Sequence, residues 1–179
     1  MADITKKSVI GNFIWRFAER CGAQLVTFIV SIVLARILDP KDYGTIALVT
    51  VFTTILQVFV DSGLGTALVQ KKDADELDFS TVFFCTLSLS IVIYIILFIG
   101  APYIAEFYHT KEIILVLRIL SIKIVLSSIA TVQHAYVQKR MIFKKFFFST
   151  LGGTVISGIL GIVLAYSGFG VWALVFQYL

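Results

Sequence analysis

The chain is poor in charge and in cysteine, and each shortage excludes a class of protein. Charged residues make up 15% of the 179 residues, whereas an average soluble domain has about 25%. Apolar residues make up 59%, so too little polar surface is left to cover a water-soluble fold. The two cysteines, Cys21 and Cys85, lie in apolar runs, where a free cysteine behaves as a small buried hydrophobe. The composition therefore argues against a soluble domain and against disulfide or metal chemistry at cysteine.

Signatures of catalysis are also missing from the sequence. It has two histidines and shows no Ser-His-Asp arrangement, no histidine-rich or cysteine-rich spacing and no phosphate-binding glycine loop. The hydrophilic loops between the apolar runs are too short to hold a catalytic domain. We therefore expect a protein that is not an enzyme and that needs no cofactor or metal.

The apolar residues are grouped into runs long enough to cross a bilayer. A spanning helix needs about 20 mostly apolar residues, and a run from 169 to the last residue is too short to cross as a helix. The pattern predicts an all-α, polytopic transmembrane bundle with about six spans, the last one truncated. We expect residues 1–179 to form the N-terminal lobe of a longer protein whose C-terminal lobe is absent. The five complete spans are predicted at 13–38, 45–69, 79–101, 113–138 and 148–167.

Basic residues are divided unevenly between the two sides of this predicted bundle. If the N-terminus is cytoplasmic, Lys6, Lys7, Lys71, Lys72, Lys139, Arg140, Lys144 and Lys145 lie inside, and Lys41 and Lys111 lie outside. Cytoplasmic loops are enriched in lysine and arginine, so the N-terminus is predicted to be cytoplasmic. The net charge of +4 then indicates membrane lipids as partners, and we expect no nucleic-acid binding.

Polar side chains form stripes on three of the predicted helices. An ionised side chain near the bilayer centre costs about 2.5–3.5 kcal/mol on insertion scales, so such residues normally face a bundle interior or a water-filled cavity. At about 100° per residue each stripe occupies one face of its helix, and together they predict one shared aqueous cleft. The stripes are Arg16, Glu19, Arg20, Gln24, Thr27 and Ser31; Thr50, Thr54, Gln57 and Asp61; and Lys123, Ser127, Thr131, His134 and Gln138.

Several charged residues of these stripes have structural alternatives. Arg16 and Arg20 could extend to the headgroups or pair with Glu19, although Glu19 can neutralise only one of them. Asp61 could form an interhelical salt bridge with either arginine. His134 could titrate near neutral pH and relay a proton, or it could be a hydrogen-bonded packing residue.

Other residues of the apolar segments are expected to serve the fold. Gly153, Ser157 and Gly161 share one face of the fifth span, which lets another helix approach closely. Arg36 and Arg118 lie toward the outer surface, where they can anchor the protein at the interface. The sequence predicts breaks between helices at Asp39-Pro40, at Gly168 and at the tripeptide 100–102.

A cleft lined by cations in a helical bundle suits an anionic cargo, because fixed guanidinium and ammonium groups bind phosphate oxygens. The sequence therefore indicates a transporter. The residues predicted to bind cargo are Arg16, Arg20, Gln24 and Lys123. The residues predicted to couple an ion or to line the cavity are Glu19, Gln57, Asp61 and His134.

Two segments carry a family resemblance. Residues 32–44 contain the pattern L-A-R-x-L-x-P-x-x-Y-G, and residues 61–70 begin with D-x-G-L. Together they resemble the N-terminal helices of bacterial polysaccharide or oligosaccharide flippases of the Wzx type, in the multidrug/oligosaccharidyl-lipid/polysaccharide exporter superfamily. The likeness extends through residues 133–140, the polar, basic end of the fourth predicted span.

The resemblance implies a protein of about twelve to fourteen transmembrane helices in two lobes around a central cavity. Such proteins are thought to move undecaprenyl-pyrophosphate-linked oligosaccharide repeat units across the bacterial cytoplasmic membrane by alternating access, in the biosynthesis of lipopolysaccharide, exopolysaccharide or another surface polysaccharide. By this likeness Arg16 and Arg20 would meet the pyrophosphate, with Lys123 as a further cation. Other polysaccharide-assembly proteins are implied as partners.

Three alternatives remain open at the level of sequence. A multidrug exporter of the same superfamily would take cationic cargo, and the predicted cleft has an excess of only one cation. A membrane enzyme of polysaccharide assembly would need catalytic residues beyond residue 179. A scaffold protein would gain nothing from three polar stripes inside the membrane.

Overall fold

The computed structural model describes residues 6–61, 63–71, 73–140 and 143–179 of the chain. These residues form helices joined by short turns, and no strand occurs among them. The prediction of an all-α bundle is therefore confirmed. The helices are α1 Lys6–Ile37, α2 Pro40–Asp61, α3 Leu64–Gln70, α4 Glu76–Phe107, α5 Glu112–Leu120, α6 Ile122–Arg140, α7 Phe143–Tyr166 and α8 Val171–Tyr178.

Five helical segments in this part of the chain are long and apolar enough to cross a membrane. In two of them the helix is interrupted, because α2 and α3 form one segment and α5 and α6 form another. The chain is thus a multi-pass membrane protein. The segments cover Ile14–Ile37, Pro40–Gln70, Glu76–Phe107, Glu112–Lys139 and Phe146–Tyr166.

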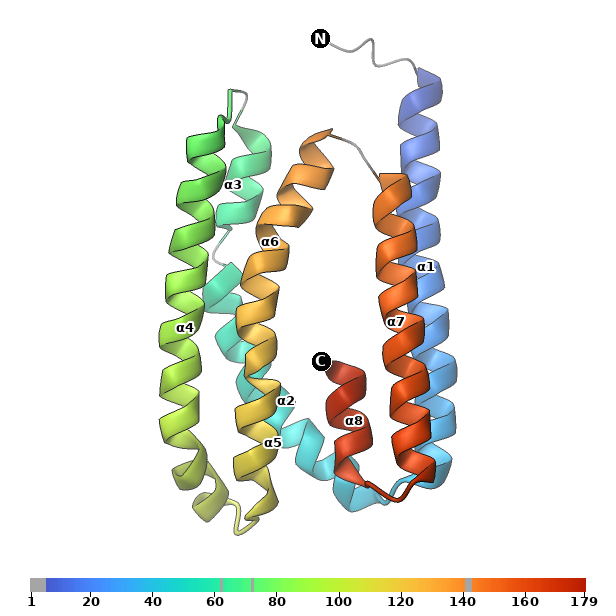
Figure 1. Cartoon of the computed structure of the whole chain (residues 1–179), viewed down its shortest axis with the longest axis vertical. Coiled ribbons are helices and arrows are strands. Elements are labelled where there is room, and N and C mark those ends of the chain that lie inside the picture. The colour runs from blue at the N-terminus through green and yellow to red at the C-terminus, as the bar shows by residue number, and fades with distance from the viewer. Residues whose placement is uncertain (1–5, 62, 72, 141–142) are drawn as a thin grey trace.

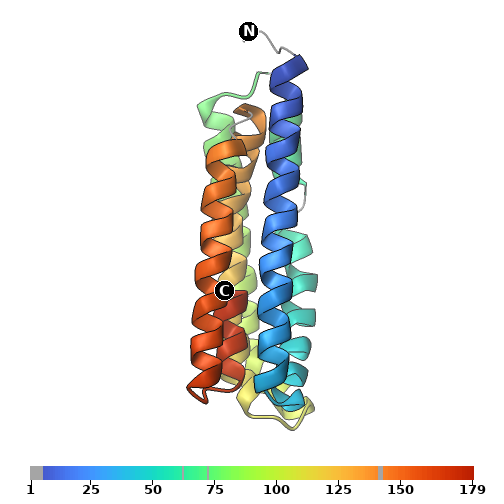
Figure 2. The ribbon, with the colours of Figure 1, turned by 90° about the vertical axis from the view of Figure 1, so that its right-hand side faces the viewer.

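The helices are arranged in two groups (Figures 1 and 2). Helices α1 and α7 pack side by side along their length, whereas α3, α4 and α6 form the other side of the bundle. Helix α2 crosses obliquely between the two groups, and α8 rises from the far end to place the C-terminus at mid-height. Helix α8 contacts α2, α5 and α7, so it joins the two groups in the half of the bundle distant from the N-terminus.

The buried core lies in that same half. Its largest fully buried side chains come from α1, α2, α5, α6 and α8, so the core is built where the crossing helix and the short last helix meet. They include Leu34, Val49, Ile113, Leu117, Ile124 and Leu174.

Helix α4 continues through Pro102 to Phe107, so the break expected at 100–102 is wrong. A proline inside a helix has no N–H for the carbonyl four residues before it, which here is the carbonyl of Phe98. Arg118 of α5 supplies a replacement, because its Nε donates to the Phe98 carbonyl oxygen at 3.3 Å. The guanidinium carbon also lies 4.1 Å from the centre of the Phe98 ring. A cation from a neighbouring helix thus compensates the missing hydrogen bond.

The motif beginning at Asp61 ends one helix and starts another. Gly63 has a φ of 78°, a left-handed conformation that glycine adopts at little cost. Two residues later, a Cβ added at Gly65 would lie 2.8 Å from Cγ2 of Thr131. The first glycine therefore permits the turn, and the second lets α3 pack closely against α6.

The small residues of α7 do not all pack against the same helix. A Cβ added at Gly161 would lie 3.2 Å from the carbonyl oxygen of Ala173 in α8, whereas Gly153 has open space around it. The close approach to α1 occurs instead at Gly158, where an added Cβ would lie 2.7 Å from Val30. Of the predicted face, Ser157 and Gly161 are therefore turned toward α8 rather than α1.

Candidate functional site: polar cavities around Lys123

The polar stripes of α2 and α6 meet in a direct side-chain contact. Nε2 of Gln57 donates to Oγ of Ser127 at 2.8 Å and to Oδ1 of Asp61 at 3.1 Å. The second bond holds Asp61 at the end of α2, one helical turn from Gln57. The amide of Gln57 therefore ties two helices together through polar groups.

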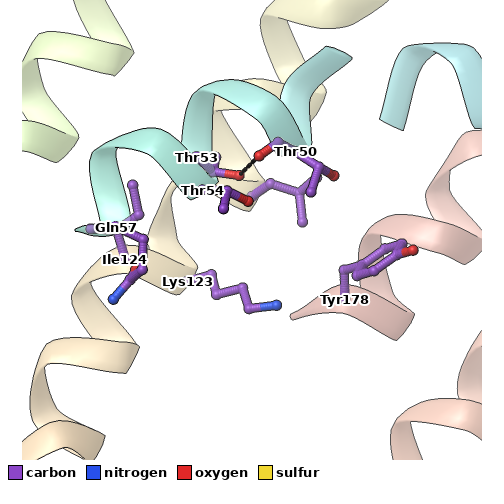
Figure 3. A pocket seen from close by; sticks show the side chains of 8 residues that line it. Thr50, Thr53, Thr54, Gln57, Lys123, Ile124 and Tyr178 are labelled. Atoms are coloured by element: carbon purple, nitrogen blue, oxygen red, sulfur yellow. Dashed lines mark hydrogen bonds between the residues drawn. The ribbon is translucent and has the colours of Figure 1, made fainter. Parts of the chain in front are cut away.

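Lys123, the second residue of α6, extends into a cavity of about 110 Å³ between α2, α6 and α8 (Figure 3). The end of its side chain points toward Tyr178, and Nζ lies 5.7 Å from the centre of the Tyr178 ring. An ammonium group within about 6 Å of an aromatic face is attracted by the ring electrons. We call this space the Lys123 cavity; its walls are Thr50, Thr53, Thr54, Gln57, Leu120, Lys123, Ile124 and Tyr178.

Lys123 also borders a second cavity, of about 210 Å³, on the side of α1 and α7. Thr27 brings the α1 stripe to this cavity, and Thr154 and Ser157 bring hydroxyl groups from α7. Tyr178 borders both spaces. The polar stripes of α1, α2 and α6 therefore reach cavities that share Lys123.

The predicted cargo-binding residues of α1 lie elsewhere. Arg16 Nη1 pairs with Glu19 Oε2 at 3.2 Å, and Glu19 is buried. Arg20 and Gln24 are exposed. Since Arg20 is seven residues before Thr27, it lies about 10 Å further along the helix axis. Of the four residues predicted to bind cargo, Lys123 is the one that borders both cavities.

Two of the four predicted ion-coupling residues meet in the half of the bundle nearer the N-terminus. Asp61 and His134 line one cavity of about 210 Å³ together with Thr66, Thr131 and other residues of α3 and α6. We call this space the Asp61 cavity. Gln57 links it to the Lys123 cavity, because Gln57 borders the latter and hydrogen-bonds Asp61.

His134 additionally contacts α7. Its ring meets the ring of Phe146 edge to face, with 4.7 Å between the centroids. His134 thus packs against an aromatic ring and also borders a polar cavity, and its role as a proton relay stays a prediction.

Sequence reasoning missed Tyr178 and Tyr43. Tyr178 borders the Lys123 cavity, the α1/α7-side cavity and a third space of about 530 Å³, which Tyr43 of α2 also lines. Tyr178 follows an apolar run, and Tyr43 lies near the start of α2 beside Lys41 and Asp42, so neither tyrosine was part of a polar stripe. The pair Gln177 and Tyr178, two polar groups following an apolar run, was the available signal.

At the end of the bundle nearest the N-terminus, Lys71 forms an ion pair with Asp78 at 2.6 Å. The hydrogen bond to Asp78 raises the pKa of Lys71 above its ordinary value, so Lys71 keeps its charge to a higher pH than an unpaired lysine would. Its stabilising contribution is present below the ordinary lysine pKa and is lost as the pH rises through the raised value. Lys139 of α6 donates a hydrogen bond to the Lys71 carbonyl oxygen at 2.8 Å. This bond links α6 to the turn between α3 and α4.

Within the residues described by the structure, no group of three or more histidine, cysteine, aspartate or glutamate side chains could hold a metal ion. The side chains that line the cavities around Lys123 and Asp61 supply an ammonium group, hydroxyl groups, amides, one carboxylate and one imidazole.

Residues 33–179 match the family described as "Polysaccharide biosynthesis protein". The chain belongs to this family. The match covers most of the chain, including every residue of the Lys123 cavity and of the third space that Tyr43 and Tyr178 line. The resemblance seen in residues 32–44 and 61–70 is thereby confirmed.

Individual relatives have names from polysaccharide biosynthesis. The chain is 27% identical over 174 residues to the succinoglycan biosynthesis transport protein ExoT of Rhizobium meliloti, which covers 97% of this chain and 35% of that protein. It is 25% identical to the teichuronic acid biosynthesis protein TuaB of Bacillus subtilis, over 80% of this chain and 29% of that protein. It is 24% identical to the lipopolysaccharide biosynthesis protein WzxC of Escherichia coli K12, over 63% of this chain and 23% of that protein.

The chain thus spans about a third or less of the length of these relatives. No solved structure matches it significantly.

Proposed function

We propose that this protein moves lipid-linked oligosaccharides, with an undecaprenyl-pyrophosphate carrier, across the bacterial cytoplasmic membrane. In this proposal the N-terminus is cytoplasmic and the protein works by alternating access. The observation that carries the proposal is Lys123, an ammonium group inside a membrane-spanning segment that borders two polar cavities. The family membership and the names of ExoT and WzxC support a role in transport for polysaccharide biosynthesis.

The chemistry of the Lys123 cavities favours an anionic cargo. An intramembrane lysine is costly unless it faces a polar space or a partner, and its compact charge can bind a phosphate group. The residues that line the two cavities include hydroxyl groups and amides but neither aspartate nor glutamate. A cationic drug would therefore meet a like charge there without a compensating acid.

The cargo would meet Arg16, Arg20 and Gln24 at an earlier point of its path across the membrane. They lie on α1 nearer the N-terminus than Thr27, which borders the cavity shared with Lys123. With a cytoplasmic N-terminus, a pyrophosphate would meet Arg20 and Gln24 before it reached Lys123. Arg16, which pairs with Glu19, would have a smaller direct role.

Glu19, Asp61, His134 and Gln57 are proposed to couple transport to an ion. Asp61 and His134 border one cavity, and Gln57 connects Asp61 to the cavity of Lys123. A change in the charge of Asp61 would alter its hydrogen bond with Gln57, and thereby the wall of the Lys123 cavity.

The test is complementation of a strain that lacks the gene. Lys123→Ala should abolish surface polysaccharide at normal protein abundance in the membrane, and Lys123→Arg should restore part of it because the charge is kept. Lys111→Ala removes an exposed lysine in the turn before α5 and is the matched control. Normal surface polysaccharide in the Lys123→Ala strain would refute the proposal.

A further inference from the structure

Tyr178 continues the buried face of α8 beyond the core. The buried residues of α8 include Val171, Leu174 and Val175. Tyr178 lies two helical turns after the first of them and one turn after the other two, and residues at these spacings share one face of a helix. The core contacts of α8 therefore determine the direction in which the Tyr178 ring leaves the helix.

Lys123 continues a second buried face in the same way. Val116 and Leu120 of α5 are buried, and Lys123 lies two helical turns after the first and one turn after the second. Ser121 stands between α5 and α6 and keeps helical backbone angles, so the face is carried over into α6. The core therefore also determines where the Lys123 side chain starts.

The two side chains meet where these faces end. Nζ of Lys123 lies 5.7 Å from the centre of the Tyr178 ring, and the end of the lysine side chain points toward that ring (Figure 3). Both residues border the Lys123 cavity and the cavity on the side of α1 and α7. The ammonium group is therefore placed against the ring and beside both spaces.

An aromatic ring holds a lysine in a way that suits the binding of an anion. A carboxylate would fix the ammonium group but would also neutralise it, whereas an aromatic face attracts a cation and carries no net charge. The residues that line the two cavities include neither aspartate nor glutamate, and neither ion pair among the described residues involves Lys123. The contact with Tyr178 thus restrains a flexible side chain and leaves its charge available to a ligand.

We propose that Tyr178 is a positioning residue that holds the ammonium group of Lys123 in place for the phosphate of the cargo. This inference rests on the proposed function, because it assumes that Lys123 binds a phosphate. The ring lies on one side of the ammonium group and the phosphate approaches from another, so the ring contact is kept when cargo binds. A charge that is already held in place loses less conformational freedom on binding, which increases the affinity.

The experiment measures the binding of two lipids, a polyprenol and the corresponding polyprenyl pyrophosphate, to the intact protein in nanodiscs. Tyr178→Leu should weaken binding of the pyrophosphate about twofold to fivefold, the effect of one cation–π contact at an accessible site. Binding of the polyprenol should be unchanged, because it carries no phosphate. Tyr178→Phe keeps the ring and should bind the pyrophosphate nearly as well as the wild-type protein.

Two further measurements separate positioning from packing. In the Lys123→Ala background, Tyr178→Leu should cause no further loss of pyrophosphate affinity, because the group that the ring holds is gone. Fluorinated phenylalanines at position 178 keep the shape of the ring and weaken the negative charge of its face, so the affinity should fall with each added fluorine. Tyr103→Leu replaces an exposed tyrosine of α4 and is the matched control, with both affinities unchanged.

The possible failures are distinguishable. If Tyr178→Leu leaves the pyrophosphate affinity unchanged, or lowers it equally with and without Lys123, the ring does not position the ammonium group. Tighter binding by Tyr178→Leu would show that the ring competes with the phosphate, and an affinity that ignores fluorination would show that the ring only packs; either result overturns the proposal. If the wild-type protein does not prefer the pyrophosphate to the polyprenol, or Lys123→Ala does not weaken its binding, the proposed function itself fails.

Discussion

Arg118 donates a hydrogen bond to the carbonyl oxygen of Phe98, the oxygen that loses its helical partner because residue 102 is proline. The contact joins α5 to the C-terminal third of the long helix α4. It gives Arg118 a structural role in the fold that is separate from the polar stripes, and it explains how an apparent helix breaker is accommodated within a membrane span.

The hydrogen bond between Arg118 and Phe98 predicts that the loss of stability caused by Arg118→Ala depends on which residue occupies position 102. Arg118→Ala should lower the free energy of unfolding by about 1–3 kcal/mol, because the Phe98 carbonyl loses its donor. When Pro102 is also replaced by alanine, the backbone N–H of residue 102 supplies a donor, so the cost of Arg118→Ala should shrink. Reversible unfolding of the four proteins in detergent measures this coupling. Equal costs in both backgrounds would show that Arg118 does not compensate Pro102.

The close approach of α1 and α7 predicts a difference between two glycines. Gly158→Ala should destabilise the protein by about 1–3 kcal/mol, because the added Cβ would lie 2.7 Å from Val30 and crowd a packed interface. Gly153→Ala is the matched control, since open space surrounds that position and alanine favours helix. Thermal unfolding of both variants tests the packing. An unchanged melting temperature for Gly158→Ala would contradict it.

The position of Asp61 in the Asp61 cavity predicts that one substitution can impair the coupling of transport to an ion without unfolding the protein. Asp61→Asn keeps the size of the side chain and can still accept a hydrogen bond from Gln57, but it cannot change its charge. We expect the variant to fold normally and to transport slowly, with a weaker dependence on an imposed pH gradient. Transport measured in proteoliposomes with and without the gradient checks this result. A wild-type response to the gradient would exclude Asp61 as the coupling residue.

The topology can be tested with single cysteines after Cys21 and Cys85 have been replaced by alanine. Both native cysteines are exposed on the helices, so they must be removed first. A membrane-impermeant maleimide added outside intact cells should label a cysteine at position 111 and spare one at position 73. The reverse labelling pattern would place the N-terminus on the outside.

The sequence predicted the helical class and the apolar spans well, because a bilayer imposes a strong length and composition pattern. It predicted that Gln57 and Ser127 lie on stripes facing a common interior, and the two side chains do hydrogen-bond. Helix periodicity identified the faces correctly in these two cases because both helices are regular at those positions.

The sequence could not reveal contacts that depend on how helices cross. The continuation of α4 through Pro102 depends on Arg118, which is sixteen residues further along the chain. The position of Tyr178 over Lys123 depends on α8 folding back to mid-height. The separation of Arg20 from the Lys123 cavities likewise follows from where α1 meets α7. Periodicity gives the face of a helix but neither its neighbour nor the depth at which two faces meet.

The most direct test of the role of Lys123 is the transfer of a fluorescent polyprenyl-pyrophosphate oligosaccharide between the leaflets of proteoliposomes that contain the intact protein. We predict rapid transfer by the wild-type protein, partial transfer by Lys123→Arg and background transfer by Lys123→Ala, with all three inserted to equal extent. Transfer by Lys123→Ala at the wild-type rate would contradict the account.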